Sequence, residues 1–256
     1  MHQELGRRGA GWPAPRVVAS VESTNAEVAT LAAQGVREGF VLVAEQQTSG
    51  RGRLDRAWVS PRGAGLTLSV LLRPAPPRST WGWLPILAGL AMLDAVAKRS
   101  QLEANLKWPN DLLLGSGQAK AGGILAEAGD GAVVVGVGVN VSTTAAELPP
   151  GATSLLIEGA LVSREALLVE VVLALESRYA GWTAARGDAA ASGVLAAYSS
   201  RCATLGRGVT VQMPHGDALV GIAEAIDPSG GLQVRAGDGT VTTVVAGDVV
   251  HVRPER

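Results

Sequence analysis

Residues 105–141 read NLKWPNDLLLGSGQAKAGGILAEAGDGAVVVGVGVNV. Short apolar runs alternate in this segment with Gly, Asn and Pro, which favour turns. The pattern predicts four strands, Asn105–Trp108, Asp111–Leu114, Gly122–Glu127 and Ala132–Val141. We therefore expect the middle of the chain to be built on a β-sheet.

Helices and further strands are expected on both sides of this region. Ser23 is a suitable N-cap for a helix, and several segments repeat apolar residues at helical spacing. Residues 1–15 are rich in Gly and Pro without periodicity, which is typical of a loose end. The expected helices are Ser23–Gln34, Trp83–Lys98, Ser163–Tyr179 and Asp188–Tyr198, and the expected strands are Phe40–Ala44 and Gly65–Leu72.

The pattern changes after about Leu205, where only short strands follow. They are separated by turn signals at residues 227–231 and at Asp238-Gly239. The expected strands are Val209–Met213, Ala218–Ile226, Leu232–Arg235, Val241–Val245 and Val249–Val252. We interpret this part as a small β-barrel, residues 205–256, that follows a larger α+β domain, residues 1–204.

Composition excludes several classes of protein. The 256 residues carry 22 basic and 23 acidic side chains, so the chain is not a globally basic nucleic-acid binder. Its 47% hydrophobic content is too high for a disordered chain. Cys202 is the single cysteine, and the three histidines are far apart in the sequence, so neither a disulfide nor a zinc site is expected. No run approaches the roughly 20 apolar residues of a membrane span, and no secretory signal is recognisable, which predicts a cytoplasmic protein.

One candidate binding segment is Gly50–Arg56, which reads GRGRLDR. Glycines allow a close backbone approach to a ligand, and arginines donate bidentate hydrogen bonds to phosphate or carboxylate. The segment lacks the Gly-Lys-Ser/Thr ending of a P-loop. A solvated surface loop, or a nucleic-acid patch that includes Arg62, would have the same composition.

A second candidate is Lys107–Asp111, which reads KWPND, together with Lys120. Lysine occurs only three times, at Lys98, Lys107 and Lys120, in a chain that otherwise uses arginine. Two of the three therefore fall in one short segment, which suggests chemistry that needs a compact ammonium group. A simple strand–turn–strand corner would also explain Asn110 and Asp111.

Gly136 and Gly138 interrupt an apolar strand that ends at Asn140. Glycines in such a strand indicate close approach of a ligand or of another part of the chain.

Taken together, these segments resemble the biotin protein ligase family. The resemblance covers Ser23–Asn25, Gln47–Trp58 with Ser60-Pro61, Lys107–Asp111, Lys120–Glu127 and Gly136–Asn140, in the family's order. It implies a mixed-sheet catalytic domain, an SH3-like C-terminal domain, and the reaction of biotin with ATP to biotinyl-5′-AMP. The biotinyl group then passes to a lysine on the biotin carboxyl carrier domain of a carboxylase.

The resemblance also implies roles for individual residues. Lys120 would hold the biotin carboxyl group and the α-phosphate, Arg53 would act with it, and Asp111 would orient or deprotonate the acceptor lysine. Biotin would contact Ser23, Thr24, Asn25, Gln47, Arg51, Gly52, Arg53, Lys120, Gly136 and Gly138. ATP, with Mg²⁺, would contact Arg51, Arg53, Arg56, Trp58, Lys107, Asn110, Lys120 and Asn140. No residue is identified as a metal ligand.

Asp55 departs from the family pattern, because it places a carboxylate where the family's loop usually has glycine. Three alternatives remain: a lipoate- or octanoate-type ligase, a biotin-sensing DNA-binding repressor, and a biotin-binding relative without catalysis. About 20 residues precede Ser23, too few for a helix-turn-helix domain, so no DNA partner is expected. The expected state is a monomer or a weak homodimer.

Overall fold

The larger of two sheets has seven strands and is mixed. The computed structural model describes residues 11–54, 56–213, 217–245 and 247–251. The sheet contains β1 (Arg16–Val18), β2 (Val41–Ala44), β3 (Gly65–Leu72), β4 (Ala104–Lys107), β5 (Asp111–Leu114), β6 (Ala119–Gly129) and β7 (Ala132–Asn140). Its order is β1-β2-β3-β7-β6-β5-β4. The pair β1 and β2 is parallel, and the other neighbours are antiparallel.

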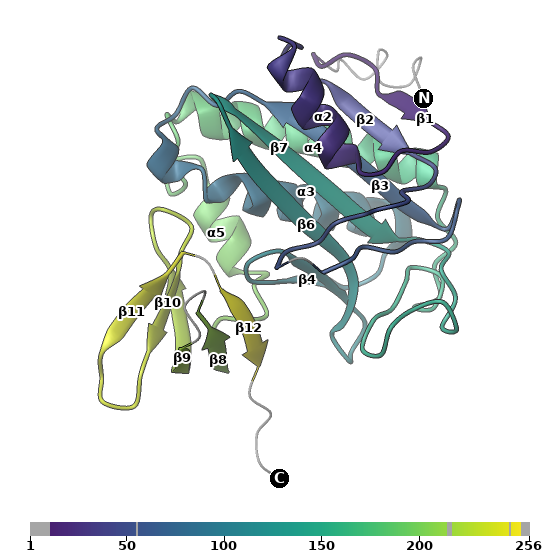
Figure 1. The fold of residues 1–256 in the computed structure, drawn as a ribbon. Coiled ribbons are helices and arrows are strands. Elements are labelled where there is room, and N and C mark those ends of the chain that lie inside the picture. Colours follow the sequence, from purple (N-terminus) through teal and green to yellow (C-terminus); the bar gives the residue numbers. More distant parts are fainter. Residues whose placement is uncertain (1–10, 55, 214–216, 246, 252–256) are drawn as a thin grey trace.

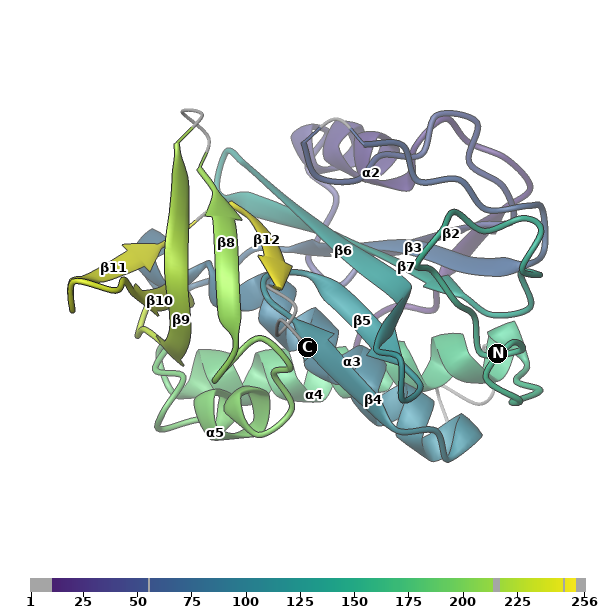
Figure 2. The same cartoon turned by 90° about the horizontal axis from the view of Figure 1, so that it is seen from below.

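Helices cover both faces of this sheet (Figure 2). One face carries α2 (Thr24–Ala33). The opposite face carries α3 (Trp83–Ser100) and α4 (Arg164–Ala184), which pack against each other. A 3-10 turn (Arg78–Thr80) precedes α3, and α5 (Val194–Ser199) leads to the C-terminal part of the chain.

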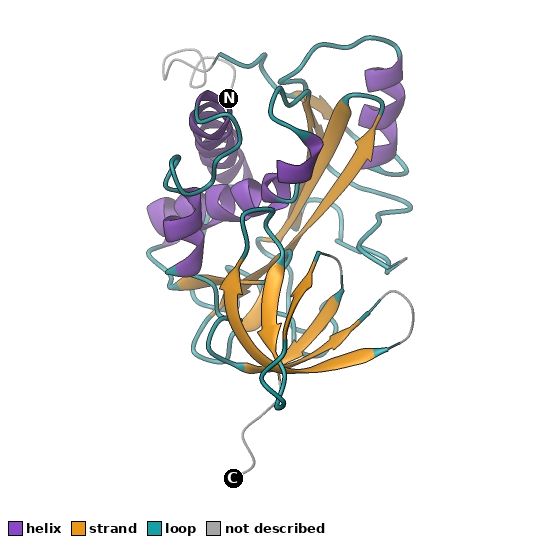
Figure 3. Ribbon diagram, turned by 90° about the vertical axis from the view of Figure 1, so that its left-hand side faces the viewer, coloured by secondary structure: helices purple, strands orange, loops and turns teal. Residues whose placement is uncertain are grey.

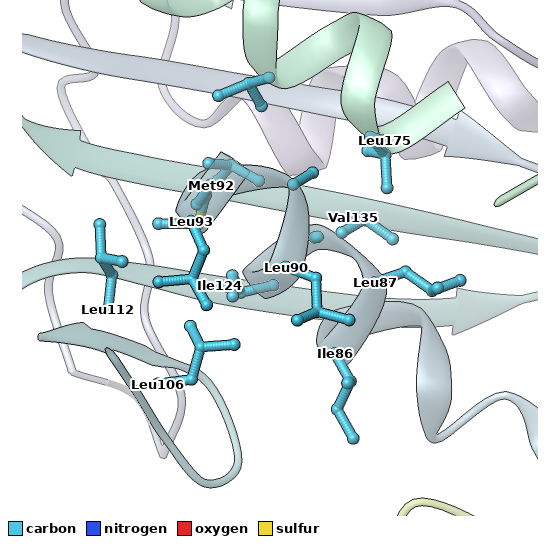
Figure 4. Packing of buried hydrophobic residues seen from close by; sticks show 14 of the residues in the cluster. Ile86, Leu87, Leu90, Met92, Leu93, Leu106, Leu112, Ile124, Val135 and Leu175 are labelled. Atoms are coloured by element: carbon cyan, nitrogen blue, oxygen red, sulfur yellow. The ribbon is translucent and has the colours of Figure 1, made fainter. Parts of the chain in front are cut away.

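Alternation along the central strands separates the two faces. In β3, Leu66, Leu68, Val70 and Leu72 belong to the main core with α3 and α4, whereas Leu71 packs in a smaller cluster with Val28 of α2. Figure 4 shows the main core, where Leu87 and Leu90 of α3 lie near Ile124 and Val135. Burial of each such side chain contributes about 1.5–3 kcal/mol. This core fixes the sheet whose other face carries the polar residues described below.

The second sheet is antiparallel and has five strands (Figures 1 and 3). It contains β8 (Gly208–Gln212), β9 (Ala218–Ile226), β10 (Leu232–Arg235), β11 (Val241–Val244) and β12 (Asp248–His251), in the order β11-β10-β9-β8-β12. All five strands predicted after Leu205 are therefore confirmed, although Val252 lies outside the described residues. Within the described part of the chain, β11 and β12 are the two outer strands of this order.

Two buried tryptophans, Trp83 of α3 and Trp108 directly after β4, bind the turn at residues 227–231, which we call the Asp227 turn. Trp83 Nε1 donates to Pro228 O at 2.8 Å, and Trp108 Nε1 donates to Gly230 O at 3.1 Å. Gly82 packs so closely that a Cβ there would lie 2.3 Å from Ser229 O. The Asp227 carboxylate keeps the turn in shape by accepting from Ser229 N, Ser229 Oγ and Gly231 N. The two sheets are thus joined through specific hydrogen bonds.

Most predicted elements are confirmed, and Ser23 is the N-cap of α2, accepting from Ala26 N. The helix predicted over Asp188–Tyr198 is wrong in its first half, because α5 begins at Val194. Asp188 Oδ1 accepts from Ala190 N and Ala191 N, which stabilises a turn, and Gly193 has φ of 75°. Strand β1 was not predicted. Residues 1–10 of the expected loose end, and Asp55, lie outside the described residues.

No helix in the described ranges is long and apolar enough to cross a membrane.

Candidate functional site

A cavity of about 570 Å³ opens on the face of the large sheet that carries α2. This volume is within the range of small-molecule sites. The N-terminus of α2, the Gly50–Arg56 loop and strands β3, β5, β6 and β7 all contribute to its wall. Of the expected site residues, it is lined by Ser23, Thr24, Asn25, Gln47, Arg51, Gly52, Arg53, Arg56, Trp58, Asn110, Asp111, Lys120, Gly136, Gly138 and Asn140. The structure therefore brings together segments that are far apart in the sequence.

Glycines form the floor of the cavity. Gly123 of β6 is the register partner of Gly138 of β7, and Gly136 is the partner of Ser69 in β3. A Cβ at Gly136 would lie 2.2 Å from Asn25 Oδ1, and one at Gly138 would lie 2.5 Å from the Trp58 ring. Both glycines line the cavity, and each also leaves room for a neighbouring side chain, Asn25 at Gly136 and Trp58 at Gly138.

Hydrogen bonds connect the polar residues at the α2 end of the cavity. Gln47 Oε1 accepts from Thr24 N at 2.7 Å and from Thr24 Oγ1 at 2.9 Å. Ser69 Oγ lies 2.7 Å from Thr24 Oγ1 and 2.6 Å from Asn25 Oδ1. Ser23, Thr24 and Asn25 are all buried. The cluster thus holds hydroxyl and amide groups, which can donate and accept hydrogen bonds, in fixed positions at this end of the cavity.

The Gly50–Arg56 loop is a narrow turn over the cavity. Arg51 pairs with Ala57 in an antiparallel bridge, and Gly52 N donates to Arg56 O at 2.6 Å. Arg51 Nη2 forms an ion pair with Glu127, at 3.1 Å from Oε1. Arg53 Nη2 donates to the backbone oxygen of Gly247, which directly precedes β12, at 3.1 Å. The loop is therefore held by contacts with β6 and with the residue before β12.

Lys120 and Asp111 form an ion pair in the cavity wall, with Nζ 2.6 Å from Oδ1. Strands β5 and β6 are paired with a register shift between Leu112 and Leu113, which lies between the two residues in the ladder. The Lys120 side chain is 39% exposed, whereas that of Asp111 is 17% exposed. An ammonium group is thus held at the cavity with its charge accessible to a ligand.

Two asparagines and a tryptophan complete the wall. Asn110 Nδ2 donates to Ile124 O at 2.9 Å, and Asn140 Nδ2 donates to Thr153 O at 3.0 Å. Trp58 Nε1 is buried and has no hydrogen-bond partner in the described part of the protein. A buried donor without a partner is costly, so this group is a candidate for a hydrogen bond to a ligand.

Lys107 is the one expected site residue that does not line the cavity. It lies at the end of β4, and its charge lowers the pKa of His251 in β12. That pKa falls to about 4, first because the imidazole is partly buried and then because Lys107 and Arg207 are near. His251 Nε2 lies 3.2 Å from Thr204 Oγ1, which accepts from Trp108 N.

Sequence reasoning missed Glu127 and Ser69 as individual residues. Glu127 Oε2 accepts from Asn25 Nδ2 at 2.7 Å, so this carboxylate contacts both Asn25 and Arg51. A charged residue near the end of a strand is usually interpreted as facing solvent. A serine within a buried strand is usually interpreted as a small residue that fills space in the core. Ile124 is a core residue, and residues three positions apart in a strand face opposite sides of the sheet. This alternation was the available signal that Glu127 faces away from the main core.

Comparisons with known proteins identify the family of the chain. Residues 17–143 match the model of the biotin/lipoate A/B protein ligase family, and residues 204–252 match the biotin protein ligase C terminal domain. The chain is 43% identical to the biotin–[acetyl-CoA-carboxylase] ligase of Mycobacterium tuberculosis, over 99% of this chain and 94% of that protein. It is 33% identical to the corresponding ligase of Paracoccus denitrificans, over 86% and 93% of the two chains.

Solved structures show the same relationship. A biotin protein ligase from Aquifex aeolicus, in complex with biotin and ATP, superimposes with a TM-score of 0.77 at 25% identity. The match covers 94% of this chain and all of that one. The family models, a relative that matches nearly the whole chain, and the fold all support one conclusion. The chain belongs to the biotin protein ligase group of the biotin/lipoate A/B protein ligase family.

Proposed function

We propose that the chain activates biotin with ATP and transfers the biotinyl group to a lysine of a biotin carboxyl carrier domain of an acyl-CoA carboxylase. The observation that carries this proposal is one cavity lined by Ser23–Asn25 at the start of α2, by the Gly50–Arg56 loop, which we call the arginine loop, and by Lys120. Relatives named as ligases of acetyl-CoA carboxylase, and a similar structure that holds biotin and ATP, support it.

In the first step a biotin carboxylate oxygen attacks the α-phosphorus of ATP. A new P–O bond forms, the bond to the β-phosphate oxygen breaks, and pyrophosphate leaves. In this proposal Lys120, whose ammonium group lies in the cavity wall, contacts both the carboxylate and the α-phosphate and stabilises the charge that develops between them. Arg51, Arg53 and Arg56 bind phosphate oxygens from the loop above.

In the second step the amine of the acceptor lysine attacks the acyl carbon of biotinyl-5′-AMP. An amide forms, AMP leaves, and the amine loses a proton. Asp111 lines the cavity next to Lys120, so it is placed to orient that amine or accept its proton.

The remaining residues divide between the two substrates. Ser23, Thr24, Asn25 and Gln47 bind or position the ureido end of biotin, Gly136 and Gly138 accommodate Asn25 and Trp58 beneath it, and Gly52 keeps the loop narrow. Trp58, Asn110 and Asn140 face the nucleotide. Residues 1–204 would then form the substrate-binding domain, and residues 205–256 would anchor its loop through Gly247.

Mg²⁺ is expected to accompany ATP. The described residues contain no group of three or more His, Cys, Asp or Glu side chains that could hold a metal ion. In ATP sites Mg²⁺ usually keeps several water ligands and binds substrate phosphates together with one or two carboxylates. Because the reaction consumes ATP, we place it in the cytoplasm, and we expect a monomer or a weak homodimer.

Biotin-dependent exchange of labelled pyrophosphate into ATP tests the first step. Exchange that requires biotin and is not supported by lipoate or octanoate is expected. Exchange with lipoate in place of biotin would indicate the lipoate-type alternative, and biotin binding without any exchange would indicate a protein that only binds it.

A further inference from the structure

We propose that Glu127 is a positioning residue that holds Arg51 at the cavity wall before ATP binds. The inference rests on the proposed function, because it concerns the binding of ATP by Arg51. It assigns a role to a carboxylate that does not itself line the cavity.

Glu127 contacts two parts of the site at once. It lies near the end of β6, beside the N-terminus of α2 and below the arginine loop. Its Oε2 accepts from Asn25 Nδ2 at 2.7 Å, and its Oε1 lies 3.1 Å from Arg51 Nη2. One carboxylate therefore connects the α2 residues to the loop.

The Asn25 side of this connection is rigid. Asn25 Nδ2 donates to Leu125 O at 3.1 Å as well as to Glu127, and Asn25 Oδ1 lies 2.6 Å from Ser69 Oγ. Asn25 is buried, and its amide lies against Gly136, where no Cβ would fit. All polar atoms of the amide are thus engaged, and the orientation of Glu127 is fixed by a group that cannot rotate freely.

The Arg51 side remains available to a ligand. The pair with Glu127 uses Nη2, and the described residues provide no hydrogen bond to Nε or Nη1. The side chain of Arg51 is 50% exposed and lines the cavity. Glu127 can therefore hold the guanidinium in place while Nε and Nη1 face an incoming phosphate. Such preorganisation reduces the loss of side-chain freedom when ATP binds.

The Glu127→Gln variant distinguishes positioning of Arg51 from a direct effect of the Glu127 charge on ATP binding. Glutamine can still accept from Asn25 Nδ2, but it loses the ion pair with Arg51. Removing a negative charge near an ATP site would by itself lower the KM for ATP, whereas loss of positioning raises it. We expect a two- to fivefold rise, roughly the effect of an exposed ion pair. The dissociation constant for biotin and kcat are expected to stay unchanged.

The test is a double-mutant cycle of Glu127→Gln and Arg51→Ala, measured by biotin-dependent pyrophosphate exchange and by direct biotin binding. In the Arg51→Ala background, Glu127→Gln should raise the KM for ATP no further. Asp130→Asn, at the exposed turn after β6, is the matched charge control and should leave the KM unchanged.

An unchanged or lower KM in Glu127→Gln, or an equal rise with and without Arg51, would overturn the inference while leaving an active wild type and the proposed function intact. A wild type without biotin-dependent exchange would overturn the proposed function, and this inference with it.

Discussion

Lys120 Nζ lies 2.6 Å from Asp111 Oδ1, and these residues belong to neighbouring strands whose register shifts between them. The ion pair keeps the ammonium group at the cavity wall in the absence of substrate. In the proposed mechanism, Lys120 would exchange or share its partner when a carboxylate and a phosphate bind, and Asp111 would then become available to the acceptor amine. The two proposed steps thus use the two members of one pair in turn.

Lys120→Ala is expected to lower biotin-dependent pyrophosphate exchange by about 10²–10³-fold, because removal of one charge-stabilising donor costs about 3–4 kcal/mol at the transition state. Lys98 and Lys107, the other two lysines, do not line the cavity. Lys98→Ala is the control, since Lys98 pairs with Glu170 on the far side of the sheet. Near-normal exchange in Lys120→Ala would remove this residue from the mechanism.

Asp227→Ala should reduce both stability and exchange. The variant loses three hydrogen bonds that shape the turn bound by Trp83 and Trp108. A loss of about 1–3 kcal/mol in the free energy of unfolding is expected, with a melting temperature lower by several degrees. Asp238→Ala, in an exposed turn of the same sheet, should change both quantities far less. Equal effects of the two substitutions would contradict the view that the turn bound by Trp83 and Trp108 stabilises the protein more than an ordinary exposed turn does.

Acidification should destabilise the protein through His251. Its pKa of about 4 in the folded state lies below the usual 6.5, so the unfolded chain binds more protons between these values. The free energy of unfolding that is gained by keeping the imidazole neutral is complete above pH 6.5, and it is lost as pH falls toward 4. After allowance for solvent screening it amounts to about 1 kcal/mol. Urea unfolding of the wild type and of His251→Gln from pH 7.5 to 4.5 measures it, and parallel pH profiles would contradict it.

Arg53→Gly is expected to release biotinyl-5′-AMP from the cavity. The substitution removes the hydrogen bond from the loop to Gly247 O, and a reactive anhydride must be shielded from water and foreign amines. An added lysine-rich protein should become biotinylated. The variant itself should be labelled weakly, at the α-amino group and at Lys98, whose amine is engaged with Glu170. Mass spectrometry of the mixture decides this, and an unlabelled bystander with adenylate still made would refute retention by the loop.

Local patterns in the sequence were sufficient for most of the fold. Ser23, the alternating β3 and the turn-separated strands after Leu205 each follow from short-range rules. The first half of the helix expected over Asp188–Tyr198 failed because the Asp188 side chain stabilises a competing turn, a local effect that apolar spacing does not report.

The site was harder to predict where it depends on contacts distant in sequence. The resemblance located the cavity residues, but Lys107 lies beside His251 because β4 is the edge strand next to the C-terminal part. The contacts of Glu127 with Asn25 and Arg51 form only in the folded sheet, because these residues are 102 and 76 positions away in the sequence. The periodicity of a single strand does not predict contacts between such distant residues.

The dependence of the arginine loop on Gly247 has a consequence for synthesis of the protein. Every described residue that lines the cavity is translated by residue 152, yet the carbonyl that accepts from Arg53 and the turn that binds Trp108 emerge from the ribosome much later. A nascent chain therefore cannot secure its loop until the second sheet has been made. Translation order therefore delays this contact, and a partly synthesised chain lacks the hydrogen bond from Arg53 to Gly247 O.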